Sequence, residues 1–342
     1  MDYRQSGVDI DAGNETVRRI RQLARATFTP GVLSEIGSFG GLFKLDRDGL
    51  KEPVLVASAD GVGTKLKIAF MTGRHDTVGA DLVNHCVNDI LVQGARPLFF
   101  LDYLATGRLS PDVAEQVVVG VARGCRENGC ALLGGETAEM PGFYADGEYD
   151  IAGFIVGVVD RDRVINGSTI APGDVLLGLP SAGLHTNGYS LARRVFFETC
   201  GYSVDTHLAE LHGKLGDVLL AEHRSYLHTL WPLIEDRLVK GMAHITGGGI
   251  TENLPRVLPE GCAAVINPHA WTPLPVFTLL QERGGIAADE MFRAFNMGIG
   301  LILVCAPEHV DRALLASVAA GESGVTIIGH IIRGDRQVHY TR

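Results

Sequence analysis

The chain has 342 residues, of which 46% are hydrophobic and 20% charged, a composition typical of a soluble globular protein with room for two domains. Its formal net charge of −10 argues against a nucleic-acid partner, because binding to a phosphate backbone depends on many Lys and Arg side chains. No stretch approaches 18 uninterrupted apolar residues and the first residues are polar and acidic, so we expect neither a membrane span nor a secretory signal.

Two residue counts add to this description. The 43 glycines are nearly twice the usual share of about 7% and indicate many tight turns. The six cysteines are scattered without a CxxC pair or zinc-type spacing, so we expect free, mostly buried thiols in a reducing cytoplasm.

The first half of the chain alternates helical and strand patterns, an α+β order. A helix is expected after Asn14 as its N-cap, followed by the glycine-rich loop EIGSFGGLF. A second helix, from Asp76 toward Gly94, has one apolar face and a dense polar stripe that includes His85 and Asp89. The other expected elements are the strands VLVASA, PLFFLDYLA, CALLGG and IAGFIVGVV, and a helix from Pro111 to about Gly129.

A polar segment that ends in Pro-Gly, residues 160–173, separates two halves of similar size. We therefore expect domains at residues 1–170 and 171–342. The elements expected in the second half are the strand DVLLGL, the loop SAGLHTNGYS, a helix LARRVFFETC, a long amphipathic helix around 222–238, the strand MAHIT, the turn TGGGITEN, a helix NLPRVL, strands CAAVI and GLILVCA, a helix from Pro307 to about Ala320, and the strand VTIIGHII.

The stretch ADGVGTK follows the first expected strand and contains two glycines, a threonine and a lysine. It is not a P-loop, because four residues and then Gly-Lys-Ser/Thr must follow the first glycine of that motif. It also lacks the third glycine of a dinucleotide fingerprint. The remaining interpretations are a phosphate-binding turn of another kind and an ordinary connection from strand to helix.

Three carboxylates from separate segments, Asp60, Asp89 and Glu136, lie near strand ends or on the polar helix stripe. Magnesium prefers oxygen ligands and typically bridges one or two carboxylates to phosphate oxygens, so a fold that brings these residues together would make a metal-nucleotide site. Each also has a structural interpretation. Asp60 could cap the next helix, the stripe could be a solvated face, and GGET could be a simple turn.

The turns SAGLHTNGYS and TGGGITEN each lead into an expected helix N-terminus, where free backbone N–H groups suit a phosphate. The second turn could also be a simple helix start with Thr246 as a local cap. His185 and His85 could be structural histidines, and His85 with Asp89 makes a poor zinc site without further His or Cys.

In chain order, these segments resemble the phosphoribosylformylglycinamidine cyclo-ligase family, also called aminoimidazole ribonucleotide synthetase. The resemblance runs nearly end to end through YRQSGVDIDAGN, GSFGGLF, ADGVGTKLKIA, VNDILVQGARPLFFLDYLATG, GGETAEMPGFY, AGFIVGVV, HTNGYSL, HITGGGITENLPRVLP and FRAFNMGIG. It implies a two-domain α/β protein whose N-terminal domains, with mixed sheets, pair into a β-barrel at a homodimer interface, with a C-terminal α/β domain.

The resemblance also implies a cytoplasmic enzyme of purine biosynthesis. It would use ATP and Mg²⁺ to close formylglycinamidine ribonucleotide into 5-aminoimidazole ribonucleotide, with release of ADP and phosphate. The formyl oxygen would be phosphorylated and then displaced by the amidine nitrogen. The partners would be this small-molecule substrate and a second copy of the chain, with no nucleic acid and no membrane.

The site residues follow from the same resemblance. The metal ligands would be Asp60, Asp89 and Glu136, and the catalytic group would be Lys65, His185 and Asn187. The ATP site would comprise Arg21, Phe39, Gly40, Gly41, Asp60, Gly61, Gly63, Thr64, Lys65 and Asp89. The substrate phosphate would lie on Thr246, Gly247, Gly248 and Gly249, although either glycine turn could serve either phosphate.

Two positions depart from the family pattern: Ser38 stands where a glycine is usual, and Thr29 stands where an arginine commonly precedes the proline. Ser38 bears on closure of the glycine loop, and Thr29, with one positive charge fewer near the nucleotide, bears on ATP affinity more than on reaction type. Two alternatives remain at this stage, namely a small-molecule kinase of the same superfamily, which would transfer the phosphoryl group and stop, and a silent protein that keeps the fold.

Overall fold

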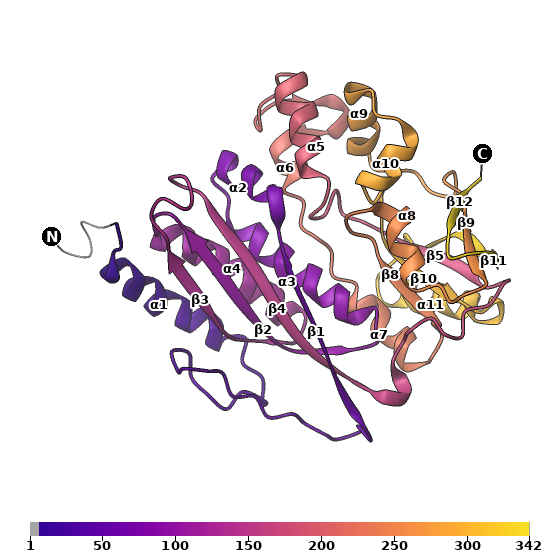
Figure 1. The fold of residues 1–342 in the computed structure, drawn as a ribbon, viewed down its shortest axis with the longest axis horizontal. Coiled ribbons are helices and arrows are strands. Elements are labelled where there is room, and N and C mark those ends of the chain that lie inside the picture. Colours follow the sequence, from indigo (N-terminus) through magenta and orange to yellow (C-terminus); the bar gives the residue numbers. More distant parts are fainter. Residues whose placement is uncertain (1–6, 342) are drawn as a thin grey trace. The chain divides into compact units, whose positions relative to one another are not determined.

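The computed structural model describes residues 7–341, which form two compact units (Figure 1). One unit comprises the described residues up to Ile90 together with Ala95–Asp162, and the other comprises Leu91–Gly94 together with the chain from Arg163 onward. Residues 3–6, at the start of the first resemblance motif, lie outside the described part. No helix within 7–341 is both long and apolar enough to cross a membrane.

The first unit is built on a four-stranded mixed sheet in the order β1-β4-β2-β3. The strands are β1 (Pro53–Gly61), β2 (Arg96–Thr106), β3 (Ala131–Glu139) and β4 (Tyr149–Asp160). β4 is antiparallel to both β1 and β2, and β2 is parallel to β3. The sheet therefore has β1 at one edge and β3 at the other.

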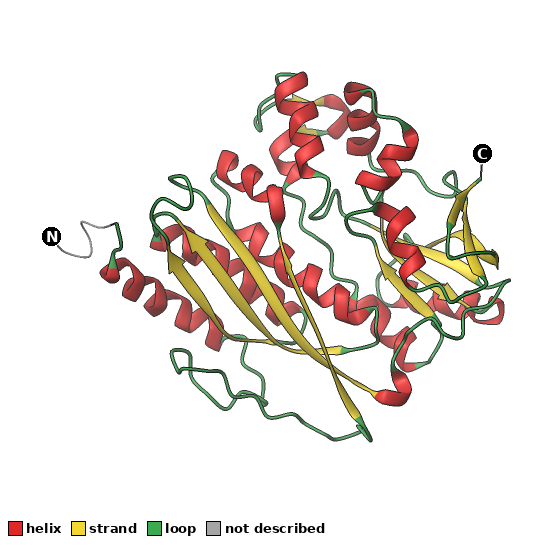
Figure 2. Ribbon diagram, in the orientation of Figure 1, coloured by secondary structure: helices red, strands yellow, loops and turns green. Residues whose placement is uncertain are grey.

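Helices cover one face of this sheet (Figure 2). They are α1 (Ile10–Arg25), α2 (Leu66–Thr72), α3 (Asp76–Leu91) and α4 (Pro111–Glu127). Side chains of the strands point alternately to the two faces, and the fully buried Phe100 and Ile155 pair across β2 and β4 on the helix side. The opposite face carries Leu55 and Phe154, which are 62% and 44% exposed.

Two glycines allow α3 and α4 to pack in close contact. A Cβ at Gly79 would lie 2.1 Å from the carbonyl oxygen of Val117, and a Cβ at Gly120 would lie 2.0 Å from that of Asp76. α3 is covered along nearly its whole length, and its polar stripe is buried except at Asp89, which is 26% exposed. The solvated-face interpretation of that stripe was wrong.

The second unit contains a six-stranded sheet in the order β12-β9-β11-β5-β10-β8. The strands are β5 (Val175–Pro180), β8 (Gly241–His244), β9 (Cys262–Ile266), β10 (Ile299–Cys305), β11 (Thr326–Arg333) and β12 (Val338–Tyr340). Only the β12–β9 pair is parallel among the described strands of this sheet. The core of this unit is a cluster of buried apolar side chains, in which Ile302 and Val304 of β10 lie with Leu176 of β5.

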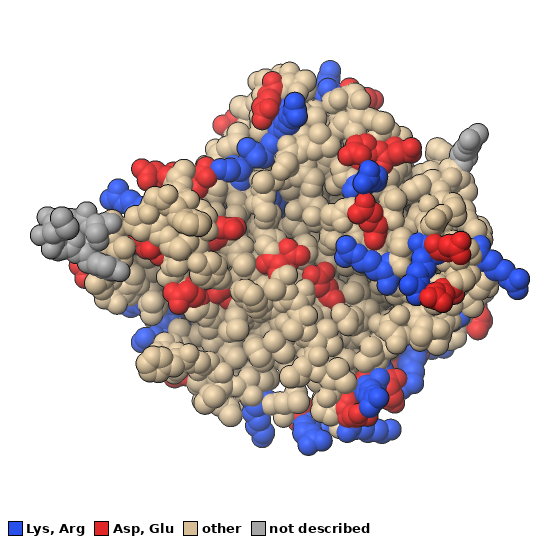
Figure 3. Space-filling view, in the orientation of Figure 1, with Lys and Arg blue, Asp and Glu red and all other residues tan. Residues whose placement is uncertain are grey.

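The remaining elements of the second unit surround this sheet. They are α5 (Tyr189–Arg193), α6 (Leu215–Leu219), α7 (Leu227–Glu235), α8 (Gly249–Asn253), α9 (Pro275–Gly284), α10 (Ala288–Ala294), α11 (Val310–Ala319) and the short hairpin β6 (His207–Leu208) with β7 (Gly213–Lys214). On the face drawn in Figure 3, acidic and basic side chains of the described residues are interspersed.

All the strands expected from the sequence are present, but several helices differ from expectation. α1 begins at Ile10, because Asp9 caps it by accepting hydrogen bonds from two backbone N–H groups, so Asn14 lies inside the helix. In place of the long helix expected at 222–238, the structure has the shorter α7. The expected helix LARRVFFETC begins as α5 and continues as a π-helical turn at Arg194–Thr199. The six cysteines are free and five of them are buried, as expected.

Candidate functional site

The first unit brings two of the predicted metal ligands together around one histidine. Nε2 of His85 lies 2.8 Å from Oδ2 of Asp60 and 3.8 Å from Oδ2 of Asp89. The hydroxyl of Ser58 donates a hydrogen bond to Asp89 at 2.9 Å. Asp60 and Asp89 are 44% and 26% exposed, so both carboxylates can reach a ligand while His85 is buried beneath them.

The charges in this group stabilise one another. Burial alone would lower the pKa of His85, but the nearby carboxylates of Asp60 and Asp89 outweigh burial and raise that pKa above its ordinary value. Burial alone would raise the pKa of Asp60, and the hydrogen bond from His85 instead lowers it. The group therefore holds an ionised carboxylate at the end of β1.

The turn after β1 places Lys65 in the core. Gly63 has φ +61°, in the region that favours glycine, and Gly63–Lys65 form one 3-10 turn before α2. Nζ of Lys65 lies 2.8 Å from Oδ2 of Asp81, and neither side chain is exposed. Thr64, in contrast, is exposed at this turn. The ammonium group thus faces α3 in this structure, and a contact with phosphate stays a prediction.

Glu136 does not join Asp60 and Asp89 within one chain. One row across the sheet contains Asp60 of β1, Gly153 of β4, Asp102 of β2 and Gly135 of β3. Asp60 and Gly135 are therefore separated by three strand spacings, about 14 Å. Glu136 is the next residue along β3, and the pleat directs its exposed side chain to the opposite face. The three carboxylates therefore do not converge within a single chain, and Glu136 as a metal ligand stays a prediction.

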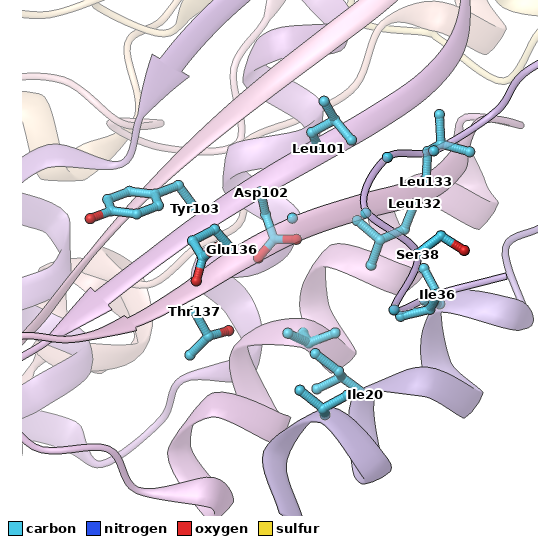
Figure 4. A pocket seen from close by; sticks show the side chains of 18 of the residues that line it. Ile20, Ile36, Ser38, Leu101, Asp102, Tyr103, Leu132, Leu133, Glu136 and Thr137 are labelled. Atoms are coloured by element: carbon cyan, nitrogen blue, oxygen red, sulfur yellow. The ribbon is translucent and has the colours of Figure 1, made fainter. Parts of the chain in front are cut away.

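A cavity of about 690 Å³ lies beside α1 and the edge strand β3 (Figure 4). The predicted nucleotide loop residues Phe39, Gly40 and Gly41 line it, as does Glu136. Arg21 is exposed and does not line the cavity. Its guanidinium group lies close to the lining residue Gly37, because a Cβ at that position would be 3.5 Å from Nη2. The glycine loop, α1 and the β2–β3 pair thus surround one space of ligand size.

Asp102 also lines this cavity, and the sequence reasoning missed it. Its side chain extends from β2 on the helix side of the sheet, between Leu132 and Glu136 in Figure 4. Burial raises its pKa to about 7. An acidic residue in the middle of the otherwise apolar stretch LFFLDYLA was the available signal.

In the second unit, His185 occupies an unusual backbone position. Its φ is +62°, a conformation that costs energy for a residue other than glycine and that often occurs at functional sites. The ring is buried, its Nε2 accepts a hydrogen bond from the amide of Ala182, and it stacks on His223 with ring centroids 4.1 Å apart. The loop that carries His185 is therefore held in one conformation.

The two glycine-rich loops of this unit lie next to each other. A Cβ at Gly247 would lie 3.1 Å from Oδ1 of Asn187. Asn253 ties the glycine turn together, because its Nδ2 donates to the carbonyl oxygens of Gly247 and Gly249 at 3.0 and 2.8 Å. Sequence reasoning assigned no role to Asn253.

Thr246 does not cap this turn, as the alternative interpretation of it required. The N-cap of α8 is Gly248, without a side-chain hydrogen bond, and the hydroxyl of Thr246 instead lies 3.3 Å from Oδ1 of Asn253. Gly249 has φ +58°, and a Cβ there would lie 1.9 Å from the carbonyl oxygen of Phe292. Glycine is therefore required at this position by both conformation and space.

These features define an α/β protein of two units, one with a cavity of ligand size and the other with two neighbouring glycine-rich loops. The N-terminal domain of AIR synthase related proteins matches residues 47–159, and the C-terminal domain of the same proteins matches residues 171–341. The chain belongs to the AIR synthase related family.

Several relatives cover nearly the whole chain. The phosphoribosylformylglycinamidine cyclo-ligase of Trichlorobacter lovleyi is 54% identical over 96% of this chain and 94% of its own length. The protein of the same name from Brevibacillus brevis is 52% identical over 99% of this chain and 97% of its own length.

Solved structures share the fold at much lower identity. Thiamine-monophosphate kinase from Stenotrophomonas maltophilia has a TM-score of 0.69 at 19% identity and covers 95% of both chains. The hydrogenase maturation protein HypE in complex with ATP has a TM-score of 0.63 at 19% identity and covers 93% of this chain and 88% of its own.

Proposed function

We propose that this chain is the ATP-dependent cyclo-ligase that converts formylglycinamidine ribonucleotide to 5-aminoimidazole ribonucleotide, ADP and phosphate. The observation that carries the proposal is 54% identity to a cyclo-ligase over 96% of this chain and 94% of the relative. The kinase of similar fold is only 19% identical, so the cyclo-ligase reaction is favoured over phosphoryl transfer alone.

The reaction requires activation of a poor leaving group. Transfer of the γ-phosphoryl group to the formyl oxygen gives an iminophosphate, in which the oxygen can leave as phosphate. The amidine nitrogen then attacks the same carbon, the C–O bond breaks, and the five-membered ring closes. Such chemistry depends mainly on positioning and charge neutralisation.

Asp60 and Asp89 suit the magnesium ion that accompanies ATP. They are hard oxygen donors, both reach the surface, and both lie next to one buried histidine. Two carboxylates are the number that magnesium commonly takes from a protein when phosphates supply the rest. Bound there, the ion would neutralise charge on the nucleotide phosphates, and His85 and Ser58 would hold the two carboxylates in position.

The cavity beside α1 is proposed to receive the nucleotide, with the loop at Phe39–Gly41 over it. Lys65, if released from Asp81, would be a candidate for the phosphates. In the second unit, His185 and Asn187 are proposed to face the reacting phosphoryl group. The adjoining turn of Thr246 and Gly247–Gly249 is proposed to hold the ribose phosphate of the substrate. The six free thiols agree with a cytoplasmic enzyme.

We further propose a homodimer in which the four-stranded sheets of two chains close into a barrel. Pairing β1 of one chain with β3 of a second would remove both sheet edges. It would also place β3 of a second chain beside β1, although Glu136 of the partner subunit would point into the barrel, on the other face of the sheet from Asp60. The exposed Leu55 and Phe154 would be covered inside the barrel.

Phe154→Asp is therefore expected to give a monomer with little or no ring-closing activity, because a charge would be buried in the barrel. Light scattering after gel filtration, at matched concentration, measures the mass. The matched control is Leu315→Asp, which places a charge on the exposed α11 side chain of the second unit. A fully active Phe154→Asp dimer would contradict the barrel.

The function itself is tested with purified protein, magnesium-ATP and formylglycinamidine ribonucleotide, following ADP and the aminoimidazole product together. Equal formation of both is expected. ADP release with a phosphorylated, uncyclised product would indicate a kinase, and nucleotide binding without any turnover would indicate a silent protein that keeps the fold.

A further inference from the structure

We infer that Asp102 forms hydrogen bonds with the edge of adenine that carries the amino group. This contact would determine how tightly ATP binds in the cavity beside α1. This inference rests on the proposed use of ATP and assigns the contact that orients the base. The first observation is the nature of the cavity walls. The apolar side chains that line it include Val17, Ile20, Ala24, Leu101, Val118 and Leu132. Such walls suit the flat faces of a base better than a ribose or a phosphate group.

The second observation is that Asp102 differs from the other two carboxylates of the cavity. Glu35 forms an ion pair with Arg25 at 2.7 Å, and Glu136 is exposed at the sheet edge. Asp102 is largely covered, and no side chain within 7–341 donates a hydrogen bond to its carboxyl group; its own backbone amide is its hydrogen-bond donor. A largely buried carboxyl that faces an apolar cavity without a side-chain partner calls for a ligand that supplies one.

The third observation is that the neighbouring strand makes room for this carboxyl group. Gly135 is the cross-strand neighbour of Asp102, and a Cβ at Gly135 would lie 2.3 Å from Oδ1 of Asp102. The same Cβ would lie 2.5 Å from the backbone carbonyl oxygen of Asp102, so a side chain at position 135 would crowd both the carboxyl group and the strand that carries it. Gly135 thus leaves the space beside β2 that the carboxyl group of Asp102 occupies.

The protonation state of Asp102 fits an adenine edge. Burial raises its pKa to about 7, so a large fraction of the group is a neutral acid near neutral pH. A neutral carboxyl donates through its O–H and accepts through its carbonyl oxygen, which matches the ring nitrogen N1 and the amino group N6 of adenine. An Asn side chain presents the same pair of functions, and Asn is a common partner of adenine.

The titratable groups around Asp102 are few. From α4, the thiol of Cys125 faces it, and burial raises the pKa of that thiol well above its usual range, so the thiol stays neutral. The remaining titratable residues that line the cavity are Glu35, Tyr103 and Glu136. No cation lines the cavity among the described residues, so ionised Asp102 would leave a carboxylate facing the lone pair of N1.

The test measures KM for ATP and the Kd of a non-hydrolysable ATP analogue by calorimetry, at pH 6 and pH 8.5. For Asp102→Leu we expect both constants to rise by roughly 10- to 100-fold with kcat nearly unchanged, because a base-reading contact is lost. For Asp102→Asn we expect tight binding at both pH values, whereas the wild type should bind more weakly at pH 8.5. Asp48→Leu, at an exposed loop carboxylate, is the matched control.

Three results would overturn the inference. Unchanged ATP affinity in Asp102→Leu would mean that the residue does not contact the nucleotide. Equal losses in Asp102→Asn and Asp102→Leu would mean that the negative charge is what matters, as in a contact with ribose or metal. An effect of Asp102→Leu that disappears with 2′-deoxy-ATP would assign the contact to the ribose.

The calorimetry separates this inference from the proposed function. A wild-type protein that binds the analogue but forms no aminoimidazole product would refute the proposed function alone. Analogue binding by the Asp102 variants would then still test the inference. A wild-type protein that binds no adenine nucleotide would refute both.

Discussion

Asp89→Asn is expected to lower kcat for formation of the aminoimidazole product on the order of 10²- to 10³-fold, while the protein stays folded. Asp60 and Asp89 both lie near Nε2 of the buried His85, and Ser58 fixes Asp89 through a hydrogen bond at 2.9 Å. Removing one of two carboxylates would weaken the hold on the metal-nucleotide complex without a change in side-chain shape. Coupled measurement of ADP and product gives kcat.

The matched control is Asp76→Asn, at the first residue of the same helix, where the side chain is exposed. We expect near wild-type activity for this control. A magnesium titration gives a second readout, because the Asp89 variant should require more magnesium for half-maximal rate, whereas a defect in packing alone would not move that midpoint. Normal kcat and an unshifted midpoint in Asp89→Asn would exclude the metal assignment.

The sequence predicted the strands of both units because each is a short apolar run between turn residues, and local pattern is sufficient there. It placed Asp60 and Asp89 correctly near each other, since one ends the first strand and the other lies on the polar stripe of the next long helix. The polar stripe itself was harder to interpret, because its burial depends on contacts with residues far away in the chain, such as the ion pair of Asp81 with Lys65.

The position of Glu136 could not be predicted, because spacing along the chain does not give the order of strands in a sheet. The order β1-β4-β2-β3 separates Asp60 from Glu136, and the pleat places them on opposite faces. Asp102 escaped notice for a related reason. A single acid in an apolar strand acquires meaning only when the cavity beside it is known.

Lys65 is the clearest case in which tertiary packing decides a role, and Lys65→Met is expected to destabilise the protein by about 3 to 5 kcal/mol. Its ammonium lies 2.8 Å from Asp81 and both side chains are fully covered, so the substitution would leave a buried carboxylate facing a methyl group. Urea unfolding of wild type and variant measures the change in free energy of unfolding.

The double variant Lys65→Met with Asp81→Leu separates the structural role from a role at the phosphates. Replacing both members of a buried ion pair by apolar side chains of similar shape is often close to neutral, so we expect most of the lost stability to return. If Lys65 serves only the fold, ATP-dependent turnover should return with it. If stability returns and turnover remains low, Lys65 leaves Asp81 during the reaction and contacts phosphate. A single variant as stable as wild type would show instead that the pair contributes no net stability.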